Sequence, residues 1–240
     1  MAKRLNLRIK AIYGLLIIVA SVLVLAAIYR YPQGVALAPQ SIHHWRQSDC
    51  AAITYNFHEQ NYPFWQPHIF GLVSDSGQSG QNLTSEIPIY YWLVAQLYEV
   101  FGADERILRT VNSLLFIGGL ILFIFSIWRY SGHLLWALSS GLLLFTPPVL
   151  VYYGNNYLTN APAFGMALGA LAWLIFYFKN GRIINWWLSM LFFLLAGALK
   201  LPGLLLFFTL ITTALVFKTS FPGLNRKSIL LSAILVLLPI

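Results

Sequence analysis

The chain has 240 residues, of which 59% are hydrophobic and only 9% are charged, and its mean hydropathy is +0.72. Soluble domains carry about 25% charged residues, so this composition excludes an ordinary soluble fold. The net charge of +8 does not indicate nucleic-acid binding, because the basic residues are scattered between apolar runs and form no patch.

Long apolar runs dominate the chain, and several approach the roughly 20 residues that a helix needs to cross about 30 Å of hydrocarbon. Their apolar residues do not alternate with a period of two, so helices must carry the crossings. We therefore predict an all-α polytopic membrane protein with about seven transmembrane helices. The predicted crossings are residues 11–29, 106–126, 134–153, 161–178, 186–198, 201–217 and 228–240.

The last apolar run differs from the others in length. It has 13 residues, about 20 Å as a helix, and stops in mid-pattern at Pro239 and Ile240. We expect a truncated final helix, and we expect the chain to be the N-terminal part of a longer protein. Residues 1–240 then form a single transmembrane module whose C-terminal part is missing.

Charge is distributed unevenly along the chain. All seven acidic residues lie within residues 31–105 together with one base, Arg46, which gives this segment a formal charge of −6. Four bases precede the first apolar run, and Lys and Arg favour the cytoplasmic side of a membrane. We predict a retained signal anchor, a cytoplasmic N-terminus, and a large outer loop over residues 31–105.

The outer loop is expected to contain two helices at the membrane surface. Ser48 is a suitable N-cap for a helix over residues 48–60. Residues 86–101 carry apolar and aromatic side chains at helical spacing, including Tyr90 and Tyr98. We predict that this second helix lies in the interface, with its aromatic side chains among the lipid headgroups.

Two carboxylates of this loop are candidates for chemistry. Asp49, placed at the start of the first loop helix, is suited to act as a general base that takes a proton from an acceptor hydroxyl or amine. Glu86, at the start of the second, is suited to hold a divalent cation or to position a substrate. Both residues also fit a purely structural role, because acids in a first helical turn stabilise the helix dipole.

Three further features have both a functional and a structural interpretation. Lys200 lies between two apolar runs, where a cation either binds a lipid phosphate or anchors the turn. Arg46 either binds phosphate or meets the headgroups. Four of the five histidines lie in the outer loop, but their spacing matches no zinc signature, so interfacial hydrogen bonding is the alternative to a metal site.

An ordered series of short segments follows this pattern along the chain. The series is Trp45-Arg46-Gln47-Ser48-Asp49, Ser85-Glu86-Ile87-Pro88-Ile89-Tyr90-Tyr91-Trp92, Phe101-Gly102, Tyr152-Tyr153, Asn160-Ala161-Pro162-Ala163 and the turn at Lys200. The series resembles the N-terminal half of the bacterial GT-C membrane glycosyltransferases of the PMT/ArnT-like group, which includes glycosyltransferase family 39.

This resemblance implies an enzyme of the bacterial cytoplasmic (inner) membrane. Such an enzyme transfers a sugar from a polyprenyl-phosphate-linked donor to a lipid, glycan or protein acceptor on the outer face. Asp49 matches the catalytic base, whereas Arg46, Glu86, Asn160 and Lys200 match substrate-binding positions. Glu86 also matches a position that helps to hold a divalent metal ion in some relatives, and Asn160 stands where many relatives have aspartate.

Two other classes of function remain open at this point. A transporter or lipid-carrier flippase would need polar residues within its crossings or helices broken in a repeated pattern. The crossings are nearly free of charge, and Pro147-Pro148 has no counterpart in a matching repeat. A non-catalytic membrane subunit is the third class, and Asn160 in place of an aspartate agrees with it.

Overall fold

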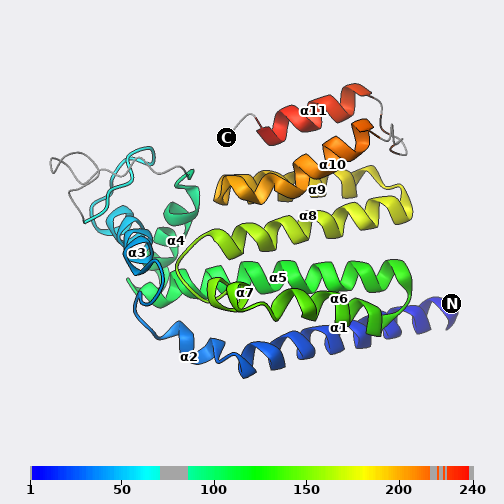
Figure 1. Ribbon diagram of the computed structural model, residues 1–240, viewed down its shortest axis with the longest axis horizontal. Helices are drawn as coiled ribbons and strands as arrows, with labels where there is room; N and C mark the ends of the chain where they lie inside the picture. The colour runs from blue at the N-terminus through cyan, green and yellow to red at the C-terminus, as the bar shows by residue number, and fades with distance from the viewer. Residues whose placement is uncertain (1, 71–85, 217–220, 222–223, 225, 238–240) are drawn as a thin grey trace.

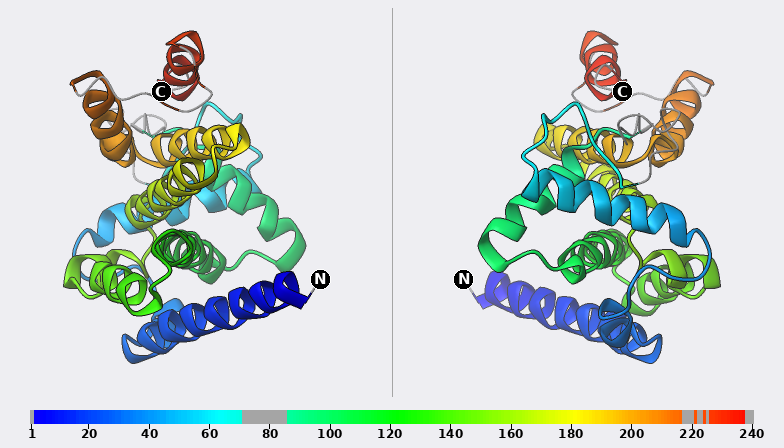
Figure 2. Two further views of the ribbon diagram at one scale, coloured as in Figure 1. Left: turned by 90° about the vertical axis from the view of Figure 1, so that its right-hand side faces the viewer. Right: turned by 90° about the vertical axis from the view of Figure 1, so that its left-hand side faces the viewer.

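The computed structural model describes residues 2–70, 86–216, 221, 224 and 226–237, and every regular element within these ranges is helical. The long apolar helices run in similar directions in the view of Figure 1, and the connecting helices gather at the end away from the N-terminus. Figure 2, turned by 90°, shows that the first helix is inclined to the central one, which is seen nearly end-on. These connecting helices are α2 (Tyr31–Val35), α3 (His44–Glu59), α4 (Ile89–Phe101) and α7 (Pro148–Tyr153).

Three helices are long and apolar enough to cross a membrane: Ile9–Ile28 within α1 (Ala2–Ile28), α5 (Glu105–Ser131) and α8 (Asn160–Asn180). The remaining apolar helices are shorter: α6 (Leu134–Phe145), α9 (Ile183–Leu199), α10 (Leu205–Val216) and α11 (Arg226–Leu237). The prediction of an all-helical chain is confirmed for the described residues, and three of the seven predicted crossings correspond to helices that are long and apolar enough to span a membrane. The predicted end at Pro239 and Ile240 lies outside the described residues.

The outward face of α1 is apolar, which agrees with contact with lipid. Ile12, Leu16, Val24 and Ile28 are each more than half exposed, although they are large hydrophobic side chains. An exposed apolar stripe of this length is unfavourable in water. The opposite face of α1 packs in a core cluster with α5 and α6, so the two faces have different surroundings.

The continuous helix predicted over residues 134–153 is interrupted. Helix α6 ends at Phe145, and α7 begins at Pro148. Pro147 is extended, with ψ 131°, and proline provides no backbone N–H for an α-helical bond. Two helices therefore replace the expected one, and α7 lies at the end of the bundle where α2 and α3 gather.

The aromatic face of α4 does not lie among headgroups, as had been expected, but packs inside the protein. Tyr90, Tyr91 and Tyr98 are each at most 5% exposed. The Tyr90 hydroxyl donates to Asn112 Oδ1 at 2.5 Å, which connects α4 with α5. Buried tyrosines need such partners, and the protein supplies them here in place of the interface.

Helices α5 and α8 approach each other closely at two glycines. A Cβ atom added to Gly119 would lie 1.9 Å from the carbonyl oxygen of Gly165, whereas a Cβ atom added to Gly118 would meet nothing within 4 Å. Small residues at a crossing let helix backbones pack directly against each other. The contact fixes the position of Asn160, at the start of α8, relative to the start of α5.

We predict that Gly119→Ala destabilises the protein by about 1–3 kcal/mol, because the new methyl group must separate α5 from α8. The matched variant Gly118→Ala adds the same group one residue earlier, in open space, and is expected to be neutral or slightly stabilising. Thermal unfolding midpoints in lipid nanodiscs measure both effects. Equal midpoints for the two variants would show that the close crossing does not limit stability.

Candidate functional site

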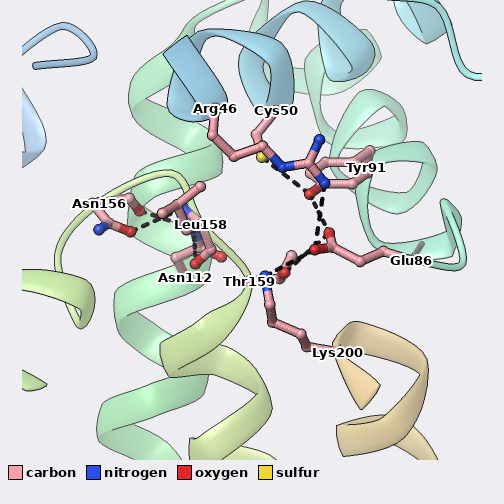
Figure 3. A network of polar contacts seen from close by, with 9 residues as sticks. All are labelled: Arg46, Cys50, Glu86, Tyr91, Asn112, Asn156, Leu158, Thr159 and Lys200. Atoms are coloured by element: carbon pink, nitrogen blue, oxygen red, sulfur yellow. Dashed lines mark hydrogen bonds and ion pairs between the residues drawn. The ribbon is translucent and has the colours of Figure 1, made fainter. Parts of the chain in front are cut away.

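A buried carboxylate forms the centre of a polar cluster at one end of the bundle. Glu86 has a side chain only 4% exposed, and its Oε1 lies 3.0 Å from Lys200 Nζ and 3.5 Å from Arg46 Nη2. Its Oε2 accepts hydrogen bonds from the Tyr91 hydroxyl at 3.0 Å and from Thr159 Oγ1 at 3.2 Å (Figure 3). One carboxylate therefore joins four side chains, three of which are distant from it in sequence.

Three members of the cluster, Glu86, Thr159 and Lys200, lie where a helix begins or ends. Glu86 lies in the bend before α4, which begins after Pro88 and not at Glu86 as predicted. Thr159 is the N-cap of α8. Lys200 is extended, with φ −164°, between α9 and the short 3-10 helix η2 (Leu201–Leu204).

Charges in the cluster determine its protonation state. Burial disfavours the ionised form of Glu86, but the charge of Lys200 and its hydrogen bond, with help from Arg46 and Tyr91, outweigh burial and lower the pKa of this carboxyl below its usual range. Glu86 is therefore ionised at neutral pH. Two cations against one anion leave the three side chains with a net charge of +1.

Arg46 and Cys50 lie one turn apart on α3 and both face the cluster. The Cys50 Sγ lies 3.1 Å from the Tyr91 hydroxyl, which in turn donates to Glu86. Burial raises the pKa of the Cys50 thiol to about 11. The thiol is therefore protonated at neutral pH and packs as a small apolar group beside Tyr91.

Asp49 lies in the interior of α3, not at the start of a helix. Helix α3 begins at His44, so Asp49 is its sixth residue, and Ser48 Oγ donates to the His44 carbonyl oxygen rather than capping a helix. The helix-start explanation of Asp49 is therefore wrong. Burial raises the pKa of the Asp49 carboxyl, and the charge of Arg46 only partly opposes this rise.

Thr159, the residue before Asn160, donates to Glu86. Asn160 is exposed, and it lines a cavity of about 420 Å³ together with Lys200. The remaining walls are mostly apolar and come from α7, α8, η2 and the start of α10. They are Val149, Leu150, Tyr153, Ala161, Ala163, Phe164, Ala167, Pro202, Gly203, Leu205 and Leu206. The cavity therefore has mostly apolar walls and one cationic side chain, that of Lys200.

The cluster brings together some of the predicted site residues and adds others. Arg46, Glu86 and Lys200 converge. Asp49 interacts electrostatically with Arg46, and Asn160 lines the cavity beside Lys200. Sequence reasoning missed Tyr91 and Thr159, as well as Cys50. The spacing of four residues between Arg46 and Cys50 is the signal that predicts Cys50 on the same helix face.

The residues around Glu86 do not fit a divalent metal ion. A cation beside this carboxylate would meet Lys200 and Arg46, both already within ion-pair distance. Among the described residues, no group of three or more His, Cys, Asp and Glu side chains is placed to hold a metal. Two of the loop histidines have other contacts: His58 Nδ1 lies 2.9 Å from Glu99, and the His68 ring stacks on Tyr62.

Comparisons with known proteins leave the site to be interpreted from its own chemistry. The chain matches no protein-family model, no curated protein and no solved structure. The protein is therefore defined by its membrane-length apolar helices and, at one end of them, by the buried Glu86 carboxylate with Lys200 and Arg46 beside an apolar cavity.

Proposed function

We propose that the chain is a multi-pass protein of the bacterial cytoplasmic membrane with about seven crossings, an inner N-terminus, and segment 31–105 outside. The bases in the first turns of α1 and at the C-terminal end of α8 support this orientation, because Lys and Arg favour the cytoplasmic side. The shorter helices α6 and α9 would cross with the help of their flanking segments. The Glu86 cluster would then lie at the outer surface.

We further propose that the protein is a glycosyltransferase that uses a sugar linked to a polyprenyl phosphate. The observation that carries this proposal is the apolar cavity lined by Lys200. A polyprenyl chain needs apolar walls, and its phosphate needs a cation where the chain leaves the hydrocarbon. Lys200 and Arg46, held by Glu86, offer that positive charge.

Asp49 serves as the base in the proposed reaction. An acceptor hydroxyl or amine attacks the anomeric carbon of the donor sugar, and Asp49 takes the acceptor proton. The new bond joins the acceptor atom to this carbon as the bond between the carbon and the phosphate oxygen breaks. The electron pair leaves with the polyprenyl phosphate, whose charge Lys200 and Arg46 stabilise.

Release of polyprenyl phosphate tests this function directly. The protein in nanodiscs is mixed with a panel of polyprenyl-phosphate sugars and a cell-envelope extract that contains lipid, glycan and protein acceptors. Release that depends on both donor and extract would support the transferase. Donor that binds and crosses the bilayer without release would support a lipid-carrier flippase, and no binding or release with any donor would support a non-catalytic subunit.

We predict that Lys200→Gln weakens donor binding by about 10- to 100-fold, the range expected when one charge-assisted contact is lost. Lys179→Gln is the matched control, because Lys179 lies in the last turn of α8, the opposite end of that helix from the cavity. Binding of a fluorescent polyprenyl phosphate to nanodiscs measures both. An unchanged affinity in Lys200→Gln would contradict a donor site at this cavity.

A further inference from the structure

A second cavity lies on the other side of α7 and differs in character from the first. Its volume is about 640 Å³, and its walls come from the junction of α1 and α2, from α3, from α5, and from α7 with the loop after it. Tyr152 lines this cavity, whereas Tyr153 lines the cavity of Lys200. Helix α7 therefore separates two sites at the same end of the bundle.

Two arginines give the second cavity a positive charge. Arg30 and Arg109 both line it, and no Asp or Glu is among its lining residues. Arg109 is only 3% exposed, yet its guanidinium donates to the carbonyl oxygens of Gly34 and Ala38 and lies 4.4 Å from the centre of the Tyr157 ring. A buried guanidinium held by carbonyls and a ring keeps its charge free for an anion.

Three side chains in the wall each retain a buried polar atom without a hydrogen-bond partner: Arg109 Nε, Asn156 Nδ2 and Gln47 Oε1. The opposite ends of the two amides are fixed. Gln47 Nε2 donates to the Gln40 carbonyl at 2.9 Å and to the Tyr152 hydroxyl at 3.0 Å, and Asn156 Oδ1 accepts from Leu158 N at 2.9 Å. The amide nitrogen of Asn156 points away from the Glu86 cluster (Figure 3).

These groups define the chemistry of a ligand. Arg109 and Asn156 offer two donors, Gln47 offers one acceptor, and the arginines supply positive charge. Unpartnered buried polar groups cost about 1–3 kcal/mol each, so a ligand that pairs them gains affinity. Each of these atoms is buried behind the surface of the cavity wall, so small side-chain rotations must accompany pairing.

We infer that this second cavity binds a phosphate group that carries neighbouring hydroxyls. The phosphate would meet Arg109 and Arg30, and a hydroxyl would donate to Gln47. Soluble sugar phosphates and lipid headgroups such as phosphatidylglycerol share this chemistry. The inference is independent of the proposed transferase, because it involves neither Asp49 nor the cavity of Lys200.

Calorimetric titration of the protein in phosphatidylcholine nanodiscs tests the site, with glucose 1-phosphate, glucose and inorganic phosphate as probes. We expect glucose 1-phosphate to bind more tightly than either of the other two. A second arm repeats the titration in nanodiscs that contain phosphatidylglycerol. Weaker binding of the sugar phosphate there would identify the lipid headgroup as a competing occupant, and unchanged binding would identify a soluble ligand.

Two variants locate the binding site. Arg30→Asn removes a charge at an exposed, left-handed position (φ 57°) that asparagine tolerates, and it is expected to weaken glucose 1-phosphate binding by about tenfold. Lys200→Gln leaves the second cavity intact and is expected to bind glucose 1-phosphate as the parent does. Loss of binding in Lys200→Gln but not in Arg30→Asn, or no binding in the parent, would overturn the inference.

Discussion

Replacement of Asp49 by asparagine is expected to lower the rate of sugar transfer by about 10² to 10⁴-fold, the usual contribution of a positioned general base. Asparagine has nearly the same shape, but it cannot take a proton from the acceptor. Donor binding should change little, because Lys200 and Arg46 remain. Initial rates of polyprenyl phosphate release, measured beside donor affinity, separate the loss of the chemical step from the loss of binding.

The folded protein should tolerate this change. Burial raises the pKa of Asp49, so folding disfavours its charged form, and an uncharged asparagine removes that penalty at neutral pH. The unfolding midpoint of Asp49→Asn should therefore equal or exceed that of the parent. Glu59→Gln is the matched control, because it removes an acid from the end of the same helix, α3, and should keep full activity.

A raised pKa of Asp49 also predicts the pH dependence of transfer. The base must be ionised, so the rate should fall as the pH decreases through this pKa, which lies above the ordinary aspartate value of 3.8. Parent-like turnover by Asp49→Asn would place the base elsewhere. A lower unfolding midpoint together with lost turnover would mean that Asp49 has a structural role instead.

The apolar runs predicted most of the helices, because a membrane-length run has few alternatives to a helix. The prediction for residues 106–126 corresponds to α5 (Glu105–Ser131), and that for residues 161–178 to α8 (Asn160–Asn180). The break at Pro147 was visible in the sequence, but a hydropathy pattern cannot tell a kinked helix from two helices. The extended conformation of Pro147 and the missing N–H of its backbone separate the two helices.

The surroundings of α4 could not be predicted from its pattern. An aromatic stripe on a helix fits a lipid interface and a protein core equally well. Both environments bury apolar area, and both can accept a hydrogen bond from a tyrosine hydroxyl. Asn112 on α5 decides between them here by accepting from Tyr90. The sequence predicted which face of α4 is apolar and aromatic, but it did not predict that this face packs against the protein.

The sequence predicted individual residues of the site, but not how they contact one another. Lys200 was singled out as a charge between two apolar runs, Arg46 as the one base of segment 31–105, and Glu86 as an acid at an expected helix start. The structure joins the three. Nothing in the sequence pattern distinguishes Tyr91 and Thr159 from other polar residues near helix starts, so only the fold reveals that they donate to Glu86. Contacts across more than 100 residues, such as that between Glu86 and Lys200, follow from helix packing.

Glu86→Gln is expected to destabilise the protein by about 2 kcal/mol at neutral pH, because it leaves Lys200 and Arg46 without their shared anion. The effect should be smaller than for a fully buried pair, since the two cationic side chains are 27% and 21% exposed. Glu99→Gln is the control, because Glu99 forms a surface contact with His58 and should change stability by less than about 0.5 kcal/mol.

The pH dependence of this difference identifies its electrostatic origin. Folding lowers the pKa of Glu86, so its contribution is fully present above the ordinary glutamate value of 4.5 and is lost as the pH falls through the folded value. The unfolding midpoints of the parent and of Glu86→Gln should therefore differ at neutral pH and converge in acid. A constant difference would assign the effect to hydrogen bonds from Tyr91 and Thr159, and no difference at neutral pH would show that the ion pairs do not stabilise the fold.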